Sequence, residues 1–397
     1  MRSPKSVCLM VTNEVTAVTF YRGYLRFLKD RGWDVSVVAA STGRLQELAE
    51  DEGVRAFDLP MRRDPALMHD LVSLIRAVAL LRRLRPEVVV AATPKAGLIA
   101  MIAAWATGVP VRVYQLWGLR LETERGWRRA LFTLLERIAG KLATQVVANS
   151  QSLAEEARRL HLSATVDVLG PGSSHGVDLD FFDSKNAGIP PADSATMRRV
   201  SECAESVVIG YVGRVHRDKG VDTLLDAVSL LAGQGIPLVL LVVGPIEDVL
   251  LKERIEEVSM PNLTIVMTGP VSDPRPYFLL MHVHVLPTRR EGFPNVVLEA
   301  GALGVPTITT LATGARDSVV NNVTGILVPV DDVVQMSREI GNITSSVTQR
   351  AMFSENARAH VAANYGRDTI FDLQEKNLNG LRETKSLEVS GLEGESS

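Results

Sequence analysis

Short runs of β-branched and aliphatic residues recur along the chain and alternate with longer stretches in which apolar residues return every three or four positions. In residues 1–170 the short runs are SVCLMVT, VSVVAA, VVVAAT, VRVYQL, QVVANS and VDVLG. These runs have the length and composition of strands, and the stretches between them have the periodicity of amphipathic helices. Such alternation predicts a parallel sheet that is covered by helices on both faces.

The alternation stops at GPGSSHG, residues 170–176, and resumes with VVIGYVG, VLLVVG, LTIVMTG, VHVLP, PTITT and ILVPV. Gly, Ser and Pro are enriched in linkers between domains. A chain of 397 residues is also longer than one ordinary hydrophobic core supports. We therefore predict an α/β fold with two Rossmann-like domains, over residues 1–170 and 171–355. Ligands of such sheets bind at the carboxyl ends of the strands, so the loops that follow the runs form the candidate site.

The composition is that of a globular protein, with 46% apolar and 22% charged residues. The two cysteines, Cys8 and Cys203, form no C-x-x-C motif, which argues against a disulfide framework or a zinc site. The basic N-terminus is followed by an apolar stretch that breaks at Thr12, and no apolar run reaches the ~20 residues of a membrane span. We therefore expect a cytoplasmic protein with neither a signal peptide nor a transmembrane helix.

The net charge of −3 hides an asymmetry between two parts of the chain. Residues 1–150 contain 22 Lys and Arg against 14 Asp and Glu, a balance of +8, so the remainder carries −11. In residues 120–141 basic residues are interleaved with apolar ones, as in Arg125, Trp127, Arg128 and Arg129. This segment is either the solvated face of a core helix or a surface that binds anionic lipid of the inner leaflet or holds an anionic lipid-linked substrate. Nucleic acid is a less suitable partner, because the whole chain is acidic and no aromatic stacking platform accompanies the basic residues.

The loop RVHRDKG, which follows the run VVIGYVG, combines two cations with two glycines. Gly213 and Gly220 allow the backbone to approach a ligand closely, and Arg214 and Lys219 lie between a strand end and a helix start. Cations and helix amides in this arrangement suit a diphosphate. For the loop alone, a surface turn is an equally simple interpretation. The sequence contains no P-loop, and no G-x-G-x-x-G motif follows a strand.

The segment EGFPNVVLE, residues 291–299, has carboxylates on either side of a predicted helix start. Asn295 is the expected N-cap, so Glu291 lies in the loop beside free backbone N–H groups and Glu299 lies about one turn inside the helix. The N–H groups suit phosphate, and the carboxylates suit the hydroxyl groups of a sugar and a ribose. The alternative is a capping carboxylate followed by an ordinary helical glutamate.

Several motifs together resemble the nucleotide-sugar-binding domain of family 4 retaining glycosyltransferases of the GT-B fold. The motifs are GRVHRDKG, VGP, TGPVSD, LPTRREGFPNVVLEAGALGVPTI with its E-x7-E signature, and TGILVPVDD. GVDLDFF resembles the linker of this family, and NARAHVAANYGRDTIFDLQEKN resembles its final helices. The resemblance implies two domains that face each other across a cleft, with helices in residues 356–384 that cross back to the first domain. The polar residues 385–397 are expected to be disordered.

The resemblance implies a role for each residue of the donor site. Arg214 and Lys219 neutralise the leaving diphosphate, and Glu291 holds the hydroxyl groups of the donor sugar, so these three are the expected catalytic residues. Glu299 binds the ribose, and the backbone around Val271 packs on the base. The further donor-binding residues are Gly213, Gly292, Phe293, Pro294, Asn295 and Asn13. No metal is expected, and the co-substrate is a nucleotide sugar, for which we expect a UDP-sugar.

The first domain departs from the pattern of the family at one position. Many members have a histidine after the fifth strand, whereas this chain has VYQLWGLRLET, with Trp117 at the corresponding position. ATPKAGL and WGLRLE resemble bacterial members that build capsule, exopolysaccharide or O-antigen repeats on polyprenyl-diphosphate carriers. This resemblance implies that Thr93, Lys95, Trp117 and Arg120 line the acceptor side of the cleft, and that Asn13 approaches the donor phosphates.

The expected function is transfer of a sugar to a hydroxyl group of an acceptor glycan linked to polyprenyl diphosphate, with retention of the anomeric configuration. The enzyme is expected to work as a peripheral protein on the cytoplasmic face of the membrane. Two alternatives remain, a nucleotide-sugar epimerase of the same architecture and a non-catalytic scaffold or sensor that binds a sugar nucleotide. The missing histidine favours the scaffold, whereas the intact Arg214, Lys219, Glu291 and Glu299 favour an enzyme.

Overall fold

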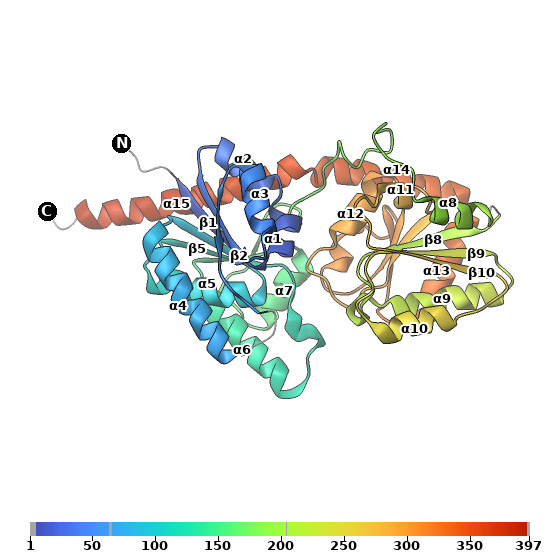
Figure 1. Cartoon of the computed structure of the whole chain (residues 1–397), viewed down its shortest axis with the longest axis horizontal. Helices are drawn as coiled ribbons and strands as arrows, with labels where there is room; N and C mark the ends of the chain where they lie inside the picture. The colour runs from blue at the N-terminus through green and yellow to red at the C-terminus, as the bar shows by residue number, and fades with distance from the viewer. Residues whose placement is uncertain (1–4, 63–65, 204, 395–397) are drawn as a thin grey trace. The chain divides into compact units, whose positions relative to one another are not determined.

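The computed structural model describes residues 5–62, 66–203 and 205–394. The chain forms two compact units, each with helices on both faces of a parallel sheet (Figure 1). Unit 1 comprises Met1–His175 together with Asp368–Ser397, and unit 2 comprises Gly176–Arg367. This is the α/β class that the alternating runs predict.

The sheet of unit 1 has seven strands in the order β3-β2-β1-β4-β5-β6-β7. Every residue of β4 is buried, and in β1 only the first and last residues are partly exposed. Strands covered on both faces need apolar residues throughout rather than at alternate positions, which explains the continuous apolar runs. The strands are β1 (Ser6–Asn13), β2 (Asp34–Ala40), β3 (Arg55–Asp58), β4 (Val88–Ala92), β5 (Val111–Leu116), β6 (Gln145–Ala148) and β7 (Asp167–Val168).

Two separate apolar layers join this sheet to its helices. One layer lies under α1 (Glu14–Tyr21), α2 (Tyr24–Asp30), α3 (Arg44–Glu52) and α15 (Arg367–Gly394). The other lies under α4 (Leu67–Leu84), α5 (Pro94–Ala106), α6 (Gly126–Leu142) and α7 (Gln151–Arg159), and η1 (Arg120–Thr123) precedes α6. In this second group, α5 packs against both α4 and α6.

The final helix, α15, is part of unit 1. Phe371 is buried in the apolar layer with Tyr24, and their ring centroids are 4.9 Å apart. The carboxylate of the buried Glu375 accepts a hydrogen bond from the Trp33 indole at 3.0 Å. Arg31 lies 2.5 Å from a carboxylate oxygen of Asp372. These contacts confirm that the last helix returns to the first domain, whereas α14 (Val347–Asn364) remains in unit 2.

The end of α15 differs from the expectation for residues 385–397. The helix continues to Gly394, so residues 385–394 are helical where we expected disorder. The last part of that expectation, residues 395–397, lies outside the described residues.

The sheet of unit 2 has six strands in the order β10-β9-β8-β11-β12-β13. Its centre is strongly apolar, because all six residues of β9 are buried. The strands are β8 (Val207–Val212), β9 (Leu238–Val243), β10 (Leu263–Gly269), β11 (Val283–Leu286), β12 (Thr307–Thr310) and β13 (Gly325–Val328). Around them lie α8 (Ser194–Ser201), η2 (Arg217–Lys219), α9 (Val221–Gly233), α10 (Val249–Glu257), α11 (Arg275–Phe278), α12 (Asn295–Ala302), η3 (Ala315–Asp317), α13 (Val333–Ser345) and α14.

Each sheet has one point at which the strand order reverses. In unit 1 the chain runs from β1 outward to β3 and then returns to β4 on the other side of β1. In unit 2 it runs from β8 outward to β10 and then returns to β11 on the other side of β8. Ligands of open α/β sheets bind at such switch points, at the carboxyl ends of the strands. The loops after β1 and β4 are therefore the candidate site of unit 1, and the loops after β8 and β11 are the candidate site of unit 2.

Candidate functional site

In unit 2 the loop after β8 is brought close to the neighbouring strand by glycine. Gly220 has φ +66°, and a Cβ at this position would lie 2.0 Å from the carbonyl oxygen of Pro287, just after β11. Gly213 has φ +150°, and its carbonyl oxygen packs on Gly244. A Cβ added to Gly244 would lie 2.1 Å from that oxygen. Only glycine permits both the backbone conformation and the close approach. The two glycines therefore hold the loop against the ends of the adjacent strands.

The structure brings Lys219 and Glu291 together at this switch point. The ammonium nitrogen of Lys219 lies 2.5 Å from Oε1 of Glu291, although the residues are 72 positions apart. The two side chains are only 21% and 12% exposed, so solvent screens their interaction less than that of a surface pair. The cation expected for the diphosphate and the carboxylate expected for the sugar are therefore in direct contact.

Arg214 lies at the end of the same strand but is paired with a different residue. Its guanidinium lies 2.5 Å from Oε2 of Glu247, in the loop after β9, and its carbonyl oxygen accepts a hydrogen bond from the Tyr211 hydroxyl at 2.7 Å. The Arg214 side chain is 43% exposed and thus accessible to a ligand. Both expected cations of the loop have acidic partners that an anionic ligand can displace.

Two arginines after β11 fix this loop to the loop after β8. Arg290 donates to Oδ2 of Asp218 at 2.5 Å, and the backbone N–H of Arg289 donates to the Asp218 carbonyl at 2.9 Å. The Arg289 guanidinium also bonds Asp222 at 2.9 Å and Asp331 at 2.8 Å. Burial alone raises the pKa of Asp222, but hydrogen bonding and charge from Arg289 hold that pKa below its ordinary value. Glu291 follows directly in the chain, so these contacts set its position.

The helix α12 begins at Asn295, one residue earlier than a cap at that position predicts. Pro294 is the N-cap, and the Asn295 side chain donates to the carbonyl of Gly176 at 2.8 Å. The prediction that Asn295 caps the helix is therefore wrong, because its amide group bonds the segment that enters unit 2. Glu299 lies inside α12 as expected, and desolvation raises its pKa to about 7, with a partial offset from the charge of Arg367.

The rest of the donor segment is held by close backbone packing. Gly314 has φ +75°, and a Cβ there would lie 2.3 Å from the carbonyl oxygen of Gly292. The N–H of Glu291 donates to the Thr313 carbonyl at 2.9 Å. Phe293 is buried, and its ring lies 5.4 Å from that of Tyr365. The expected base-binding residue Val271 lies in the loop after β10, at the edge of the sheet.

In unit 1 the switch point is closed by two threonines. The hydroxyl groups of Thr12 and Thr93, at the ends of β1 and β4, are 2.7 Å apart. Thr93 has φ +71° and ψ 143°, a conformation that strains a β-branched residue. Asn13, the neighbour of Thr12, is the N-cap of α1, and its Oδ1 accepts a bond from the Thr16 N–H at 2.9 Å. Strain of this kind is concentrated at functional sites.

The other expected acceptor residues lie on α5, after β5 and on η1. Lys95 is the second residue of α5, and its ammonium nitrogen lies 2.8 Å from a carboxylate oxygen of Asp70 on α4. Trp117 follows β5, and its ring stacks on Phe20 with centroids 4.4 Å apart. Arg120 begins η1, and its guanidinium lies 5.3 Å above the ring of Phe132. These four residues belong to one unit, but only Thr93 and Lys95 are neighbours in the chain.

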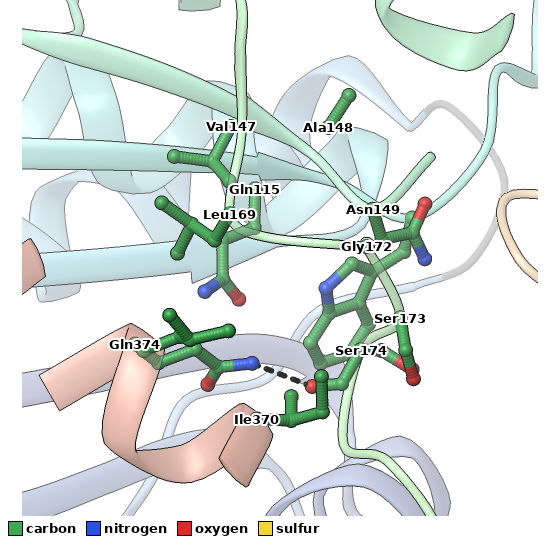
Figure 2. Close-up of a pocket in the computed structure, with 12 residues that line it drawn as sticks. Gln115, Val147, Ala148, Asn149, Leu169, Gly172, Ser173, Ser174, Ile370 and Gln374 are labelled. Carbon is green, nitrogen blue, oxygen red and sulfur yellow. Dashed lines mark hydrogen bonds between the residues drawn. The ribbon is translucent and has the colours of Figure 1, made fainter. Parts of the chain in front are cut away.

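Trp117 also lines a small buried pocket. Gln115 and Asn149 line the same pocket (Figure 2). The amide of Gln374 on α15 closes one side and donates to the carbonyl of Ser174 at 2.8 Å, the bond drawn in Figure 2. The pocket volume of about 20 Å³ is close to that of a single water molecule. It is too small to hold a sugar.

The basic segment 120–141 forms α6 and the turn before it. Trp127 is 75% exposed, and Leu134 on the same helix is 54% exposed. On the opposite face, the buried Glu136 accepts a hydrogen bond from the Tyr114 hydroxyl at 2.6 Å. Burial raises the pKa of this carboxyl to about 7, with a partial offset from the tyrosine bond. Within the described residues, none of the helices is both long and apolar enough to cross a membrane.

Metal binding receives no support from the arrangement of side chains. In the part of the chain that the structure describes, His, Cys, Asp and Glu form no cluster of three or more suited to a metal ion. His284, the more deeply placed of two histidines near β11, is fully buried against Phe278, and desolvation lowers its pKa to about 3.

The sequence alone does not identify several residues that organise the site. Glu247, Asp218, Arg289 and Arg290 are absent from the expected set, although each pairs with a neighbouring loop. The signal for Glu247 is its position after a strand end, in VGPIED. Asp218 and Arg290 carry opposite charges in loops that follow two adjacent strands, β8 and β11. This signal can be recognised only when the strand order is known.

Two α/β units, each with a switch point in its parallel sheet, and a C-terminal helix that returns to the first unit are features of the GT-B class of proteins. Residues 17–172 match the domain described as "Glycosyl transferase 4-like domain", and residues 206–346 match "Glycosyl transferases group 1". The capsular polysaccharide biosynthesis glycosyltransferase CapM of Staphylococcus aureus is 36% identical over 369 residues, which cover 91% of this chain and 94% of CapM. The chain therefore belongs to the family 4 glycosyltransferases, as its motifs predict.

Other relatives and solved structures extend the comparison. The UDP-Gal:alpha-D-GlcNAc-diphosphoundecaprenol alpha-1,3-galactosyltransferase of Escherichia coli is 26% identical and covers 83% of this chain and 85% of its own. Anabaena Alr3699/HepE, solved in complex with UDP and glucose, has a TM-score of 0.74 at 19% identity and covers 95% of this chain and 100% of its own. The sucrose-phosphate synthase of Thermosynechococcus elongatus reaches 0.75 at 18% identity, with coverage of 96% and 100%. These structures confirm the fold.

Proposed function

We propose that this glycosyltransferase moves a sugar from a UDP-sugar to a hydroxyl group of a lipid-linked glycan, with retention of the anomeric configuration. The observation that carries the proposal is the contact between Lys219 and Glu291 at the switch point of unit 2. A cation beside an acceptor-only carboxylate matches the two parts of a nucleotide sugar that meet at the reacting bond, the diphosphate and the sugar hydroxyl groups.

In this reaction the bond between the anomeric carbon and the diphosphate oxygen breaks, and the acceptor oxygen forms the new bond to that carbon. The acceptor proton leaves with UDP. Negative charge develops on the diphosphate, where Lys219 and Arg214 stabilise it. The diphosphate displaces Glu291 from Lys219, and the carboxylate then accepts hydrogen bonds from the donor sugar. Glu299 binds the ribose, the backbone at Val271 packs on the base, and Gly213 and residues 292–295 contact the phosphates.

The acceptor binds in unit 1, beside Thr93, Lys95, Trp117 and Arg120. The side chain of Asn13 already caps α1, so its approach to the donor is through the backbone. The names of CapM and of the galactosyltransferase, which includes a diphosphoundecaprenol acceptor, support a lipid-linked substrate in surface polysaccharide synthesis. Because both are glycosyltransferases, they also favour transfer over an epimerase or a non-catalytic scaffold.

The exposed face of α6 is the proposed contact with anionic lipid at the cytoplasmic side of the membrane. Its support is the combination of exposed Trp127 and Leu134 with the nearby Arg125, Arg128 and Arg129. Replacing these three arginines by glutamine is expected to weaken binding to phosphatidylglycerol vesicles, since each basic residue near such a surface contributes about 1 kcal/mol. Unchanged binding would return α6 to the interpretation of a solvated core helix.

The decisive experiment is a thermal-shift panel of UDP, GDP and ADP and their sugar conjugates, repeated with Arg214→Ala. A ligand that binds only the folded state raises Tm. We expect a rise with UDP compounds that is lost in the variant. The control is Arg338→Ala, because Arg338 forms only an exposed pair with Glu339 on α13. Absence of any shift in the native protein would overturn the donor assignment.

A further inference from the structure

The N-terminal half of α4 presents an exposed apolar face among the described residues. Its residues Leu67, Met68, Leu71, Val72 and Ile75 are between 46% and 89% exposed. On one helix these positions form a single stripe, which is separate from the buried side of α4. The stripe is about 12 Å long, from the rise of 1.5 Å per residue. Contiguous apolar surface of this kind marks a binding site more often than scattered residues do.

A groove of about 480 Å³ runs beside this face. Met68 and Val72 belong to both the face and the groove, and Met61, in the loop after β3, also lines the groove. This volume is within the range of small-molecule sites and more than twenty times that of the pocket beside Trp117. The face and groove together offer a continuous apolar surface to an extended hydrocarbon chain.

Positive charge flanks the groove. Arg62 and Arg76 line it, and neither makes a hydrogen bond or ion pair within the described residues. The nearby carboxylate of Asp70 is already occupied, because it pairs with Lys95 and accepts a bond from the Ala66 N–H. Two guanidinium groups beside an apolar groove are complementary to an amphiphile with an anionic head, and guanidinium groups suit phosphate in particular.

The charge also argues against a second copy of the chain as the occupant. A two-fold symmetric contact brings the same patch of each copy together. The arginines of one groove would then approach those of the other, with no free carboxylate nearby among the described residues. The apolar face and the cations instead fit one molecule that combines a long hydrocarbon chain with a phosphate group.

The contact between α4 and Lys95 relates the groove to the acceptor side of unit 1. Lys95 lies 2.8 Å from Asp70, the residue next to His69 in the groove wall. We propose that the groove and face of α4 hold the lipid part of the acceptor, with the hydrocarbon chain on Met68 and Val72 and the diphosphate at Arg62 and Arg76. The position of Lys95 directs the glycan toward Thr93. This inference rests on the proposed function, since it assigns a site to its lipid-linked acceptor.

The test measures flotation of the full-length protein with phosphatidylcholine vesicles that contain or lack polyprenyl diphosphate. Neutral vesicles remove the attraction of α6 to anionic phospholipid. We expect binding only with the diphosphate lipid. The double variant Met68→Gln/Val72→Gln is expected to bind about tenfold more weakly, because it removes apolar contacts with the chain. The control Val249→Gln/Leu250→Gln, two exposed apolar residues on α10 of unit 2, is expected to bind like the native protein.

Each result has one meaning. Equal binding to both kinds of vesicle would make the face a general membrane contact and overturn the assignment. Binding to neither kind, or undiminished binding of the α4 variant, would overturn it as well. The thermal shift with UDP is measured in parallel on every variant. A UDP shift without lipid binding refutes only the groove, whereas lipid binding without any nucleotide shift refutes the donor assignment and leaves the groove.

Discussion

The switch points of the two units occupy equivalent places in their sheets but are held together by different interactions. In unit 2 the loops after β8 and β11 are joined by ion pairs, Lys219 with Glu291 and Arg290 with Asp218, and glycine supplies the unusual backbone conformations. In unit 1 the ends of β1 and β4 are joined by the neutral hydroxyl groups of Thr12 and Thr93, and a threonine carries the positive φ. The ion pairs of unit 2 can be displaced by a phosphate ligand. The neutral contact of unit 1 instead suits a part of the site that keeps its shape when ligand binds.

The largest effects are expected in the charged switch point. Glu291→Ala should abolish transfer but leave UDP binding measurable, because the carboxylate is assigned to the sugar. Lys219→Ala should lower kcat by about 10³-fold and weaken UDP as well, because the ammonium group acts on the diphosphate. Steady-state kinetics and UDP titration separate the two roles.

The control for these two variants is Lys252→Ala, which removes a lysine from an exposed pair with Glu256 on α10. Its kinetics should match those of the native protein. If Glu291→Ala lost UDP binding along with transfer, the carboxylate would have to be reassigned from the sugar to the nucleotide.

The next effect concerns the glycines that hold the same loops. Gly220→Ala should destabilise unit 2 by about 3 kcal/mol. Alanine is strained in the left-handed conformation of this residue, and its Cβ would clash with the backbone of Pro287, which only backbone movement relieves. Gly235→Ala is the matched control: its φ is +86°, but no atom lies within 4 Å of the added Cβ. It should cost about 1 kcal/mol. Equal losses in urea unfolding would mean that the contact with Pro287 is unimportant.

The contrast between the units also explains what the sequence could and could not predict. The alternating apolar runs predict both sheets. The family motifs single out Lys219 and Glu291, whose roles at the diphosphate and at the donor sugar stay predictions. The pairing of Arg290 with Asp218 depends on the adjacency of β8 and β11, which is not local in sequence. The strain at Thr93 has no sequence signal, since threonine is an ordinary residue at a strand end.

A smaller effect is expected from the pair that sets the position of Glu291. Asp218→Asn should lower kcat about tenfold with little change in KM, because the loop after β11 loses its partner while the donor-binding groups remain. The exchanged pair Asp218→Arg/Arg290→Asp should recover part of the loss. Arg338→Gln, which breaks an exposed pair, is the control. If Asp218→Asn lowered both Tm and kcat, and the exchanged pair recovered neither, the role of Asp218 would be merely structural.

The smallest expected effect tests the neutral switch point of unit 1. Both Thr93→Ala and Thr93→Gly remove the hydroxyl group that contacts Thr12, but only glycine adopts φ +71° with ψ 143° without strain. In a helix or strand, glycine ordinarily makes a protein less stable than alanine does, by roughly 0.5–1 kcal/mol, because glycine has more conformational freedom in the unfolded chain. Relief of about 1–3 kcal/mol of strain should reverse that order here, so the glycine variant should be the more stable by about 1 kcal/mol. If urea unfolding showed the alanine variant to be as stable as the glycine variant or more stable, the backbone at Thr93 would not be strained. The two switch points would then differ in charge alone.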